Sequence, residues 1–393
     1  MKKIPKLRFK EFKDDWQREK LHYLSELIKD GTHGTHKDVK NGIFLLSAKD
    51  IKDGKIQIQK DCRKISFNDF GKIHKNYILQ NKDLLLTIVG TIGEVGMVEN
   101  YNRNYTFQRS VAIIRLQKQK LNPKYGLQYF KTNIFQTFLK NKTNSSAQAG
   151  VYLGELSKID MSFPSLEEQK KIADFLSAVD VRIDLTNQKL ELLEKYKKGI
   201  MQKIFNQELR FKDKYENNYP KWEEKKIEEL FKITRGYVLA KIEIKDIRIN
   251  DYIYPVFSSQ TLNNGLMGFY NKYLFENCIT WTTDGANAGT VKFRKGKFYC
   301  TNVCGVLISD TYNNNCISEI LGLETPKHVS YVGNPKLMNN IMSKIKITIP
   351  ISLEEQQKIA DFLSSIDDKI EKLSSKLEEL KEFKKGLLQQ MFV

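Results

Sequence analysis

The chain has 393 residues, more than one ordinary hydrophobic core contains and enough for two domains with connecting elements. Its composition, 40% hydrophobic and 11% aromatic with only 8 prolines, is that of a folded protein and excludes an extended disordered chain. The 65 Lys and Arg against 47 Asp and Glu give a net charge of +18, which indicates a polyanionic partner such as nucleic acid.

The sequence also argues against membrane attachment and secretion. Its longest apolar run, residues 84–89, has the length of a strand and is too short to cross a bilayer. No apolar segment that could act as a signal peptide follows the basic first residues. The 5 cysteines are scattered and odd in number, which favours free thiols in a reducing cytoplasm. We therefore expect a cytoplasmic protein with no membrane partner.

In chain order, the first part with mixed elements covers residues 16–160, which we call the first variable region. Its short apolar runs and turn residues predict strands at 44–47, 55–59, 84–89 and 111–116. A single helix is predicted over about 124–139, because it follows Pro123, which favours a helix start. A last strand is predicted at 159–163.

A long helix is predicted to begin at residue 166, where Ser165 and Glu168 form the pattern of a capping box. Apolar residues then recur at alternating steps of four and three, which is the heptad seam of a coiled coil. The seam positions are Ile172, Leu176, Val179, Ile183, Leu190, Leu193, Ile200 and Ile204, with Thr186 in the same series. The series slips once, at Tyr196 and Lys197.

The second half of the chain repeats this plan. Residues 353–392 repeat 166–205 without a gap, 187 positions later, with a second capping-box pattern at Ser352 and Glu355. The seam recurs at Ile359, Leu363, Ile366, Ile370, Leu373, Leu377, Leu380, Leu387 and Met391, with the slip at Phe383 and Lys384. A lead-in also recurs, since Leu7-Arg8-Phe9-Lys10 with Trp16 becomes Leu209-Arg210-Phe211-Lys212 with Trp222. The chain is therefore a tandem duplication.

Residues 222–349, the second variable region, differ in sequence from the first but offer the same kinds of element. Strands are predicted at 253–258, 279–283, 303–308 and 345–349, with a hairpin turning at Lys295-Gly296 and a helix at about 335–343.

The expected fold class is α+β, with two domains of mixed strands and short helices separated by two long helices. The expected boundaries are 1–160 for the first lead-in and domain, 161–206 for the first helix, 207–349 for the second lead-in and domain, and 350–393 for the second helix. Each helix needs a coiled-coil partner, and the other copy is the closest one. The alternative, a helix packed only on its own domain, would not explain why both copies share one seam.

Charge is unevenly distributed along the chain. The first variable region holds 24 Lys and Arg against 13 Asp and Glu, and the second holds 16 against 12, whereas the helices are nearly neutral. We therefore expect the polyanion to contact the variable regions, with the helices acting as a spacer.

No pattern in the sequence points to catalysis. An adenine methyltransferase needs a second proline and an aromatic ring that Asn122-Pro123-Lys124 and Asn334-Pro335-Lys336 lack, and we interpret both segments as helix starts. The glycine-rich segment 90–96 lies between two strands and lacks the Lys-Ser/Thr that phosphates require. His33 and His36 form at most half of a metal site. We expect no catalytic residue, cofactor or metal in this chain.

Both variable regions share a small polar signature. A loop bounded by Gly90 and Gly93 precedes Gln108, and a loop bounded by Gly285 and Gly289 precedes Asn302. Such loops allow close approach to a nucleic-acid backbone, and amides or Arg can contact base edges in pairs of hydrogen bonds. The alternative is that these are ordinary turns and buried groups that cap strand ends. The candidate DNA-binding residues are Arg63, Lys64, Lys72, Lys75, Thr87, Thr91, Arg103, Gln108, Arg109, Lys241, Ser258, Ser259, Gln260, Thr282, Thr283, Asn287, Lys292, Arg294, Lys295 and Asn302; the Lys and most Arg side chains suit phosphates.

The segment Pro164-x-Leu166-Glu167-Glu168-Gln169 and its repeat at Pro350 to Gln356 resemble the specificity subunits of type I restriction–modification enzymes, over the whole length of the chain. The resemblance implies an antiparallel coiled coil and two target-recognition domains, each reading half of a split, asymmetric site in double-stranded DNA. It also implies two methyltransferase subunits, which carry S-adenosylmethionine and methylate adenine N6, and restriction subunits, which are motor–nucleases that use ATP and Mg²⁺. In this interpretation the chain itself is not an enzyme.

Two alternatives stay open on the residues alone. One is a self-contained fused methyltransferase–nuclease specificity protein, against which the missing catalytic loops argue. The other is a coiled-coil scaffold whose basic domains bind RNA or acidic proteins. Different loops on nearly identical helices fit a DNA site with two halves better than either.

Overall fold

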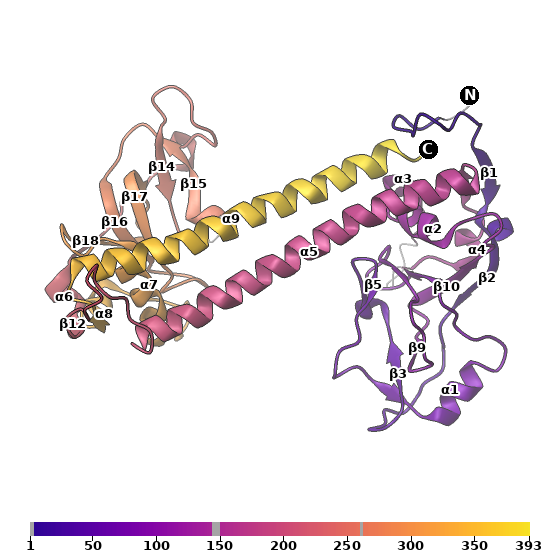
Figure 1. Cartoon of the computed structure of the whole chain (residues 1–393), viewed down its shortest axis with the longest axis horizontal. Helices are drawn as coiled ribbons and strands as arrows, with labels where there is room; N and C mark the ends of the chain where they lie inside the picture. The colour runs from indigo at the N-terminus through magenta and orange to yellow at the C-terminus, as the bar shows by residue number, and fades with distance from the viewer. Residues whose placement is uncertain (1–3, 144–149, 260–261) are drawn as a thin grey trace. The chain divides into compact units, whose positions relative to one another are not determined.

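The structure is a computed structural model that describes residues 4–143, 150–259 and 262–393. The chain divides into two compact units, Met1–Gln188 with Ser375–Val393, and Lys189–Ser374. Two long helices, α5 (Leu166–Phe205) and α9 (Leu353–Gln390), contribute to both units because the division crosses each of them (Figure 1). No helix within the described residues is long and apolar enough to span a membrane.

The first variable region is built around a four-stranded antiparallel sheet with the strand order β2–β10–β7–β8. These strands are β2 (Ser25–Asp30), β7 (Leu84–Thr87), β8 (Val95–Met97) and β10 (Val111–Leu116). A three-stranded sheet has the order β6–β3–β9, with β3 (Ile43–Leu46), β6 (Lys64–Ile65) and β9 (Tyr105–Phe107). Two short pairs complete the strands: β1 (Gln17–Lys20) with β11 (Asp160–Phe163), and β4 (Ile51–Lys52) with β5 (Lys55–Ile56).

The four-stranded sheet is buried on both faces. Leu84 and Leu86 pack with aromatic residues of α2 (Pro123–Phe130) and with one end of α5, whereas Leu85 packs with residues of β3 and β9. Burial of both faces explains why residues 84–89 are apolar at every position except Thr87 instead of alternating. The remaining helices of this region are α1 (Phe67–Ile73), α3 (Asn133–Lys142) and α4 (Leu153–Leu156).

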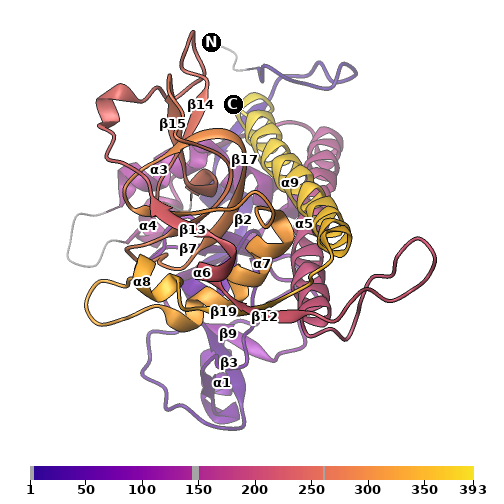
Figure 2. The ribbon, with the colours of Figure 1, turned by 90° about the vertical axis from the view of Figure 1, so that its left-hand side faces the viewer.

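The second variable region contains a six-stranded sheet with the order β13–β18–β16–β17–β14–β15. Its strands are β13 (Lys232–Arg235), β14 (Tyr254–Phe257), β15 (Leu266–Tyr270), β16 (Phe275–Thr282), β17 (Val291–Cys300) and β18 (Cys304–Ile308). A separate pair joins β12 (Glu223–Lys226) and β19 (Lys346–Ile349). The helices are α6 (Ile227–Leu230), α7 (Asn315–Glu324) and α8 (Asn339–Met342), and α7 lies between the sheet and the long helices of this unit (Figure 2).

The strand registers show that the two variable regions share one plan. Thr87 of β7 faces Val111 of β10, and Thr282 of β16 faces Cys304 of β18. Likewise, β3 pairs parallel to β9, and β14 pairs parallel to β17. The strands β2, β3, β7 and β10 therefore correspond to β13, β14, β16 and β18. The regions differ where β8 and β9 of the first are replaced by the single long β17 of the second.

The predicted helix over 124–139 is two helices. Asn122 caps α2, since its side chain accepts hydrogen bonds from the backbone N–H of Lys124 and Tyr125, as expected for a helix start. At Thr132 the backbone is extended, and the Thr132 hydroxyl accepts a hydrogen bond from the N–H of Phe135 to begin α3. A second N-cap therefore divides the segment.

Two expectations for the second variable region were wrong. Lys295-Gly296 is not a hairpin turn but a bulge inside β17, where Gly296 has a φ of +78° and its N–H donates to the Asn277 side chain at 2.8 Å. The predicted helix at 335–343 shrinks to α8, and Asn334-Pro335-Lys336 does not start a helix. The backbone of Lys336 instead forms bridges with Ser330 and Asp284, which fixes an extended conformation there.

The long helices run antiparallel. In the first unit, Ile172 and Leu176 near the start of α5 share a core with Leu387 and Met391 near the end of α9. In the second unit, Ile204 at the end of α5 shares a core with residues near the start of α9. Every predicted seam position in both helices is buried or half-buried. The predicted coiled coil is confirmed, although each helix also packs on its own variable region.

The apparent slip in the seam is a lysine that occupies a seam position. Lys197 and Lys384 are largely enclosed, whereas the neighbouring Tyr196 and Phe383 are exposed. The ammonium of Lys197 donates to Asp367 of α9 at 2.8 Å, and that of Lys384 donates to Asp180 of α5. Because the two pairs are related by the duplication, the seam is regular and polar at these points.

Candidate nucleic-acid interface

The ends of four strands meet at one loop in the first variable region. The loop is Gln108-Arg109-Ser110, between β9 and β10. The N–H of Gln108 donates to the carbonyl of Leu46 at 2.8 Å, at the end of β3. The N–H of Arg109 donates to Thr32 at 3.0 Å, just after β2, and the carbonyl of Ser110 accepts from Ile88 at 2.9 Å, just after β7. The loop backbone is therefore fixed on three sides.

The loop Thr301-Asn302-Val303, between β17 and β18, is held in the same way in the second variable region. The N–H of Thr301 donates to Phe257 at 3.0 Å, and the carbonyl of Val303 accepts from Thr283 at 3.0 Å. Spacing along the sequence matches Gln108 with Asn302, but this match is wrong. The structure places Arg109 at the position of Asn302, and Gln108 at that of Thr301.

A glycine lies under each of these loops. A Cβ on Gly31 would lie 2.1 Å from the carbonyl oxygen of Phe107, and one on Gly236 would lie 2.1 Å from that of Cys300. No other residue could bring the backbone this close. Both glycines follow an isoleucine by three positions, Ile28 and Ile233, and this weak repeat is the sequence signal that marks the shared site.

The glycine-bounded segments are hairpin turns beside these loops. The N–H of Gly93 donates to the carbonyl of Thr87 at 3.0 Å, and that of Gly289 donates to Thr282 at 2.9 Å. Gly90, Gly93, Gly285 and Gly289 all have positive φ, as such turns require. Thr87, Thr282 and Thr283 are buried. The Thr87 hydroxyl accepts from the N–H of Glu94 at 2.9 Å, and the Thr283 hydroxyl donates to Asp284 at 2.7 Å, so these two hydroxyls act within the turns.

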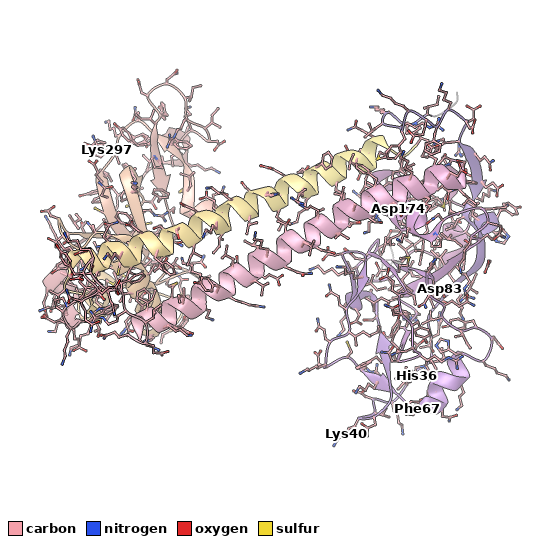
Figure 3. The ribbon with its side chains drawn as sticks, in the orientation of Figure 1. His36, Lys40, Phe67, Asp83, Asp174 and Lys297 are labelled. Carbon is pink, nitrogen blue, oxygen red and sulfur yellow. The ribbon has the colours of Figure 1, made fainter. Side chains whose placement is uncertain are left out.

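Basic residues of the first variable region lie beside the loop. The hydroxyl of Thr32 is 2.9 Å from Nε2 of His36, and Arg63 donates to the carbonyl of His36. His36 lies near α1, which begins at Phe67 (Figure 3), and its Nδ1 is 3.9 Å from the Asp69 carboxylate of that helix. Lys64 lies 4.8 Å from the centre of the Phe44 ring, and Lys72 and Lys75 are exposed in and after α1. Arg63 is thus linked to the loop of Gln108 and Arg109 through His36 and Thr32.

A pocket of about 250 Å³ lies beside the corresponding site of the second variable region, and four predicted residues, Ser258, Thr282, Lys292 and Arg294, line it. Arg294 lies 3.9 Å from the centre of the Phe257 ring and donates to the carbonyl of Asn264 at 2.7 Å. Burial lowers the pKa of Arg294 to about 10. The guanidinium remains positive at neutral pH and gives the pocket a fixed charge.

The remaining predicted residues are more dispersed. Thr91, Arg103, Lys241 and Lys295 are exposed, and Ser259 and Asn287 are half-buried. Gln260 lies outside the described residues. Among the described residues no cluster of three or more His, Cys, Asp or Glu is arranged to hold a metal ion. The five cysteines are free thiols, as expected.

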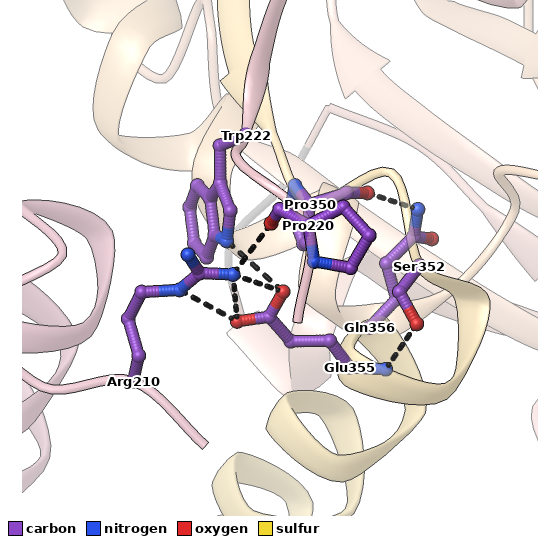
Figure 4. A network of polar contacts seen from close by, with 7 residues as sticks. All are labelled: Arg210, Pro220, Trp222, Pro350, Ser352, Glu355 and Gln356. Carbon is purple, nitrogen blue, oxygen red and sulfur yellow. Dashed lines mark hydrogen bonds and ion pairs between the residues drawn. The ribbon is translucent and has the colours of Figure 1, made fainter. Parts of the chain in front are cut away.

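The repeated motif at the start of each long helix has a structural explanation. The buried carboxylate of Glu355 accepts hydrogen bonds from Arg210 at 2.8 Å and from Nε1 of Trp222 at 3.2 Å (Figure 4). The Glu355 N–H donates to Ser352 at 3.3 Å, so only half of the predicted capping box forms. The carboxylate binds the second lead-in instead of closing the box.

The first copy repeats this interaction. The Glu168 carboxylate accepts from Arg8 at 2.7 Å, and the Glu168 N–H donates to Ser165 at 3.4 Å, again half of a capping box. The two copies differ at the tryptophan, because Nε1 of Trp16 is buried without a partner among the described residues. In each copy, the arginine of the repeated lead-in and the glutamate of the repeated helix start therefore form one ion pair.

The neighbouring glutamine ties the helix start to the variable region. Gln169 accepts from the N–H of Asn122 at 2.8 Å, and Gln356 accepts from the side chain of Asn314 at 2.7 Å. Asn122 and Asn314 are the N-caps of α2 and α7. The Glu-Gln pair of the motif therefore fixes both the lead-in and a helix of the variable region.

The family model described as the type I restriction modification DNA specificity domain matches residues 13–195 and 219–382, which is most of the chain and one match per repeat. The chain belongs to this specificity family. Its two variable regions are thus the target-recognition domains expected from the sequence, and its function is to give DNA sequence specificity.

Curated relatives carry the same family name. A putative type I restriction enzyme MjaX specificity subunit of Methanocaldococcus jannaschii is 27% identical over 96% of this chain and 93% of its own length. A putative type I specificity subunit of Mycoplasma pneumoniae is 39% identical over 39% of this chain, and that match spans 42% of the relative. The type I restriction enzyme MpnII specificity subunit of the same organism is 35% identical over 39% of this chain and 46% of its own length.

Solved structures share the fold. A type I restriction–modification S subunit from M. genitalium aligns with a TM-score of 0.69 at 16% identity, over 100% of this chain and 99% of that chain. A chain from a study of complex assembly and conformational transition of the type I system aligns with a TM-score of 0.54 at 14% identity, over 96% of this chain and 97% of that chain. This chain therefore has the same fold as these solved S subunits.

Proposed function

We propose that the two target-recognition domains of this chain read the two halves of a split, asymmetric DNA site for a type I restriction–modification complex. One observation carries the proposal. Two domains with the same strand register present different exposed side chains, Arg109 and Asn302, at the same position of the fold. A duplicated frame with different reading groups suits a site whose halves differ in sequence.

The chain supplies recognition and no chemistry in this proposal. Each of the buried carboxylates among the described residues is occupied inside the protein: Glu168, Glu355 and Asp83 each pair with an arginine, and Asp50 accepts hydrogen bonds from Ser47. We expect two methyltransferase subunits to bring S-adenosylmethionine and restriction subunits to bring ATP and Mg²⁺. One of the solved structures with this fold comes from a study of complex assembly in the type I system.

The surface charge supports DNA as the ligand. Arg63 is linked to the loop of Arg109 through His36 and Thr32, and Lys292 and Arg294 line the pocket beside the loop of Asn302. Lysine and arginine contacts to phosphates supply affinity, whereas groups in the loops supply specificity. The first domain, with the larger excess of basic residues, is expected to contribute more of the salt-dependent affinity.

The test is methyl transfer with separated components. The purified chain, the methyltransferase subunits and their mixture are each given S-adenosylmethionine and genomic DNA, and the methylated positions are sequenced. We expect only the mixture to methylate adenine, in a motif of two short halves around an unread spacer. Methyl transfer by the chain alone would contradict the non-catalytic role, and methylation by the mixture without a sequence motif would contradict the reading role.

A further inference from the structure

In the two loops that follow β9 and β17, residues at corresponding positions have the same roles. Their outer residues hold the loop: the hydroxyl of Ser110 accepts from the N–H of Ala48 at 3.1 Å, and the hydroxyl of Thr301 donates to Ser258 at 3.0 Å. The carbonyl of Val303 accepts from the N–H of Thr283 at 3.0 Å. The middle residue of each loop is exposed, whereas its two neighbours in the loop are buried or half-buried.

The middle residues, Arg109 and Asn302, are exposed, and no hydrogen bond or ion pair joins either side chain to another described residue. Arg294, by contrast, is held by Thr280, Asn264 and the Phe257 ring. A charged or amide side chain that is exposed, unpartnered and carried on a fixed backbone is arranged to bind an external group. Rigid placement matters because base contacts need correct geometry as well as the correct chemical group.

The two side chains have different and well-defined preferences among base edges. An arginine donates two parallel hydrogen bonds to O6 and N7 of guanine, and an asparagine pairs with N6 and N7 of adenine. Neither pattern fits the other purine, because adenine offers a donor where guanine offers an acceptor. One position of the duplicated fold therefore carries a guanine-type group in the first domain and an adenine-type group in the second.

We propose that Arg109 and Asn302 are the corresponding base-reading residues of the two target-recognition domains, with Arg109 selecting a G·C pair in one half-site and Asn302 selecting an A·T pair in the other. This assignment rests on the proposed function and adds the residues that execute it. Gly31 and Gly236 contribute indirectly, since only glycine lets the loop lie against the strand ends that fix it.

The test uses the complete complex with its methyltransferase subunits and compares methylated motifs. In Arg109→Ala one G·C position of one half-site should become degenerate, while the other half-site and the spacer length stay unchanged. In Asn302→Ala one A·T position of the opposite half-site should become degenerate. The untouched half-site is the internal control in each variant, and Arg182→Ala, an exposed arginine of α5, controls for the removal of one positive charge.

Binding to a library of sites gives the size of the effect. Discrimination at the affected base pair should fall by about 5- to 150-fold in the alanine variants, which corresponds to a bidentate contact of 1–3 kcal/mol. Arg109→Lys should keep part of the preference for guanine, because lysine also donates to O6 and N7. A change in overall affinity without any change in discrimination would make these residues phosphate contacts and overturn the assignment.

The outcomes separate this inference from the proposed function. If the wild-type complex methylates a two-part motif but both variants methylate the same motif, the assignment of Arg109 and Asn302 is wrong and the reading role stands. A wild-type half-site with no G·C pair in the first domain's half, or no A·T pair in the second's, would also overturn it. If a variant is inactive, its melting temperature and its library binding decide between misfolding and impaired recognition.

Discussion

Lys197 of α5 donates to the carboxylate of Asp367 in α9 at 2.8 Å, and the duplication repeats this pair as Lys384 with Asp180. Lys197 also donates to Glu319 of α7 at 2.8 Å. Although burial opposes the charge, these bonds to Asp367 and Glu319 raise the pKa of Lys197. Each pair thus fixes the register of the two helices at a point where an apolar seam alone would allow sliding.

Breaking this pair should weaken the second unit. Lys197→Ala leaves two carboxylates without their cation, and we expect the free energy of unfolding to fall by about 1–3 kcal/mol. Urea unfolding followed by circular dichroism measures this change. Lys198→Ala, an exposed neighbour, should change it by less than about 0.5 kcal/mol. Equal effects of the two substitutions would show that the ion pair contributes nothing specific.

The stability of the first unit should depend on pH through Lys131. Burial, and then the ammonium of Lys384, lower the pKa of Lys131 to about 8 from its ordinary 10.5. Between these values the unfolded chain binds more protons than the folded chain at this residue, so this contribution to the free energy of unfolding should rise with pH, by up to about 1.4 kcal/mol per unit. The difference between wild type and Lys131→Met, measured by urea unfolding from pH 7 to 10, isolates it. Lys140→Met, exposed on α3, should show a constant difference.

Charge reversal in the first target-recognition domain, which holds most of the excess charge, should change the salt dependence of DNA binding. In Lys64→Glu with Lys75→Glu, the slope of the logarithm of the binding constant against that of salt concentration should become shallower by about one unit for each phosphate that these side chains neutralise in the wild type. The matched variant is Lys189→Glu with Lys195→Glu, two exposed lysines of α5. If the two double variants have equal slopes, Lys64 and Lys75 lie outside the interface.

Lengthening α5 should lengthen the unread spacer. Four residues inserted between Leu185 and Lys195 add ~6 Å of helical rise. At ~3.4 Å per base pair of DNA, the spacer can grow by at most about 2 base pairs. Because a four-residue insertion is a stutter that the seam absorbs by local unwinding, a gain of one base pair is also consistent. Sequencing of methylated positions gives the result; retained methylation at the original spacing would show that the helix does not set this distance.

The architecture could be predicted because the duplication constrains it twice. The seam positions follow from repeated residues, and the helix start at Asn122 follows from the proline after it. The pairing of each lead-in arginine with the glutamate of a helix start was not predicted, because the same glutamates fit a capping box. The failures were local. The predicted helix is divided because the Thr132 hydroxyl caps a second helix. Gly296 forms a bulge because the Asn277 side chain accepts a hydrogen bond from its N–H, and no short-range sequence pattern distinguishes such a bulge from a turn. Lys336 is held extended by backbone bridges to Ser330 and to Asp284, the second of which is distant in sequence.

The candidate site was harder to predict than the scaffold. Loop chemistry identifies Arg109 and Asn302 as candidates but matches Asn302 with Gln108, since residue counting does not account for the different lengths of the chain between the hairpin and the loop. Only the registers of β7 with β10 and β16 with β18 align the two loops. The buried threonines show the opposite error, because a polar side chain next to a turn can serve the turn itself.

The ion pairs of Arg8 with Glu168 and of Arg210 with Glu355 affect how variable regions can be exchanged between related chains. Each pair closes the frame around one variable region, with the arginine before it and the glutamate after it. A genetic crossover within the repeated helix segments would therefore deliver a foreign variable region together with its own matching arginine and glutamate. The recombined chain would keep both ion pairs, so two target-recognition domains of different origin could share one frame.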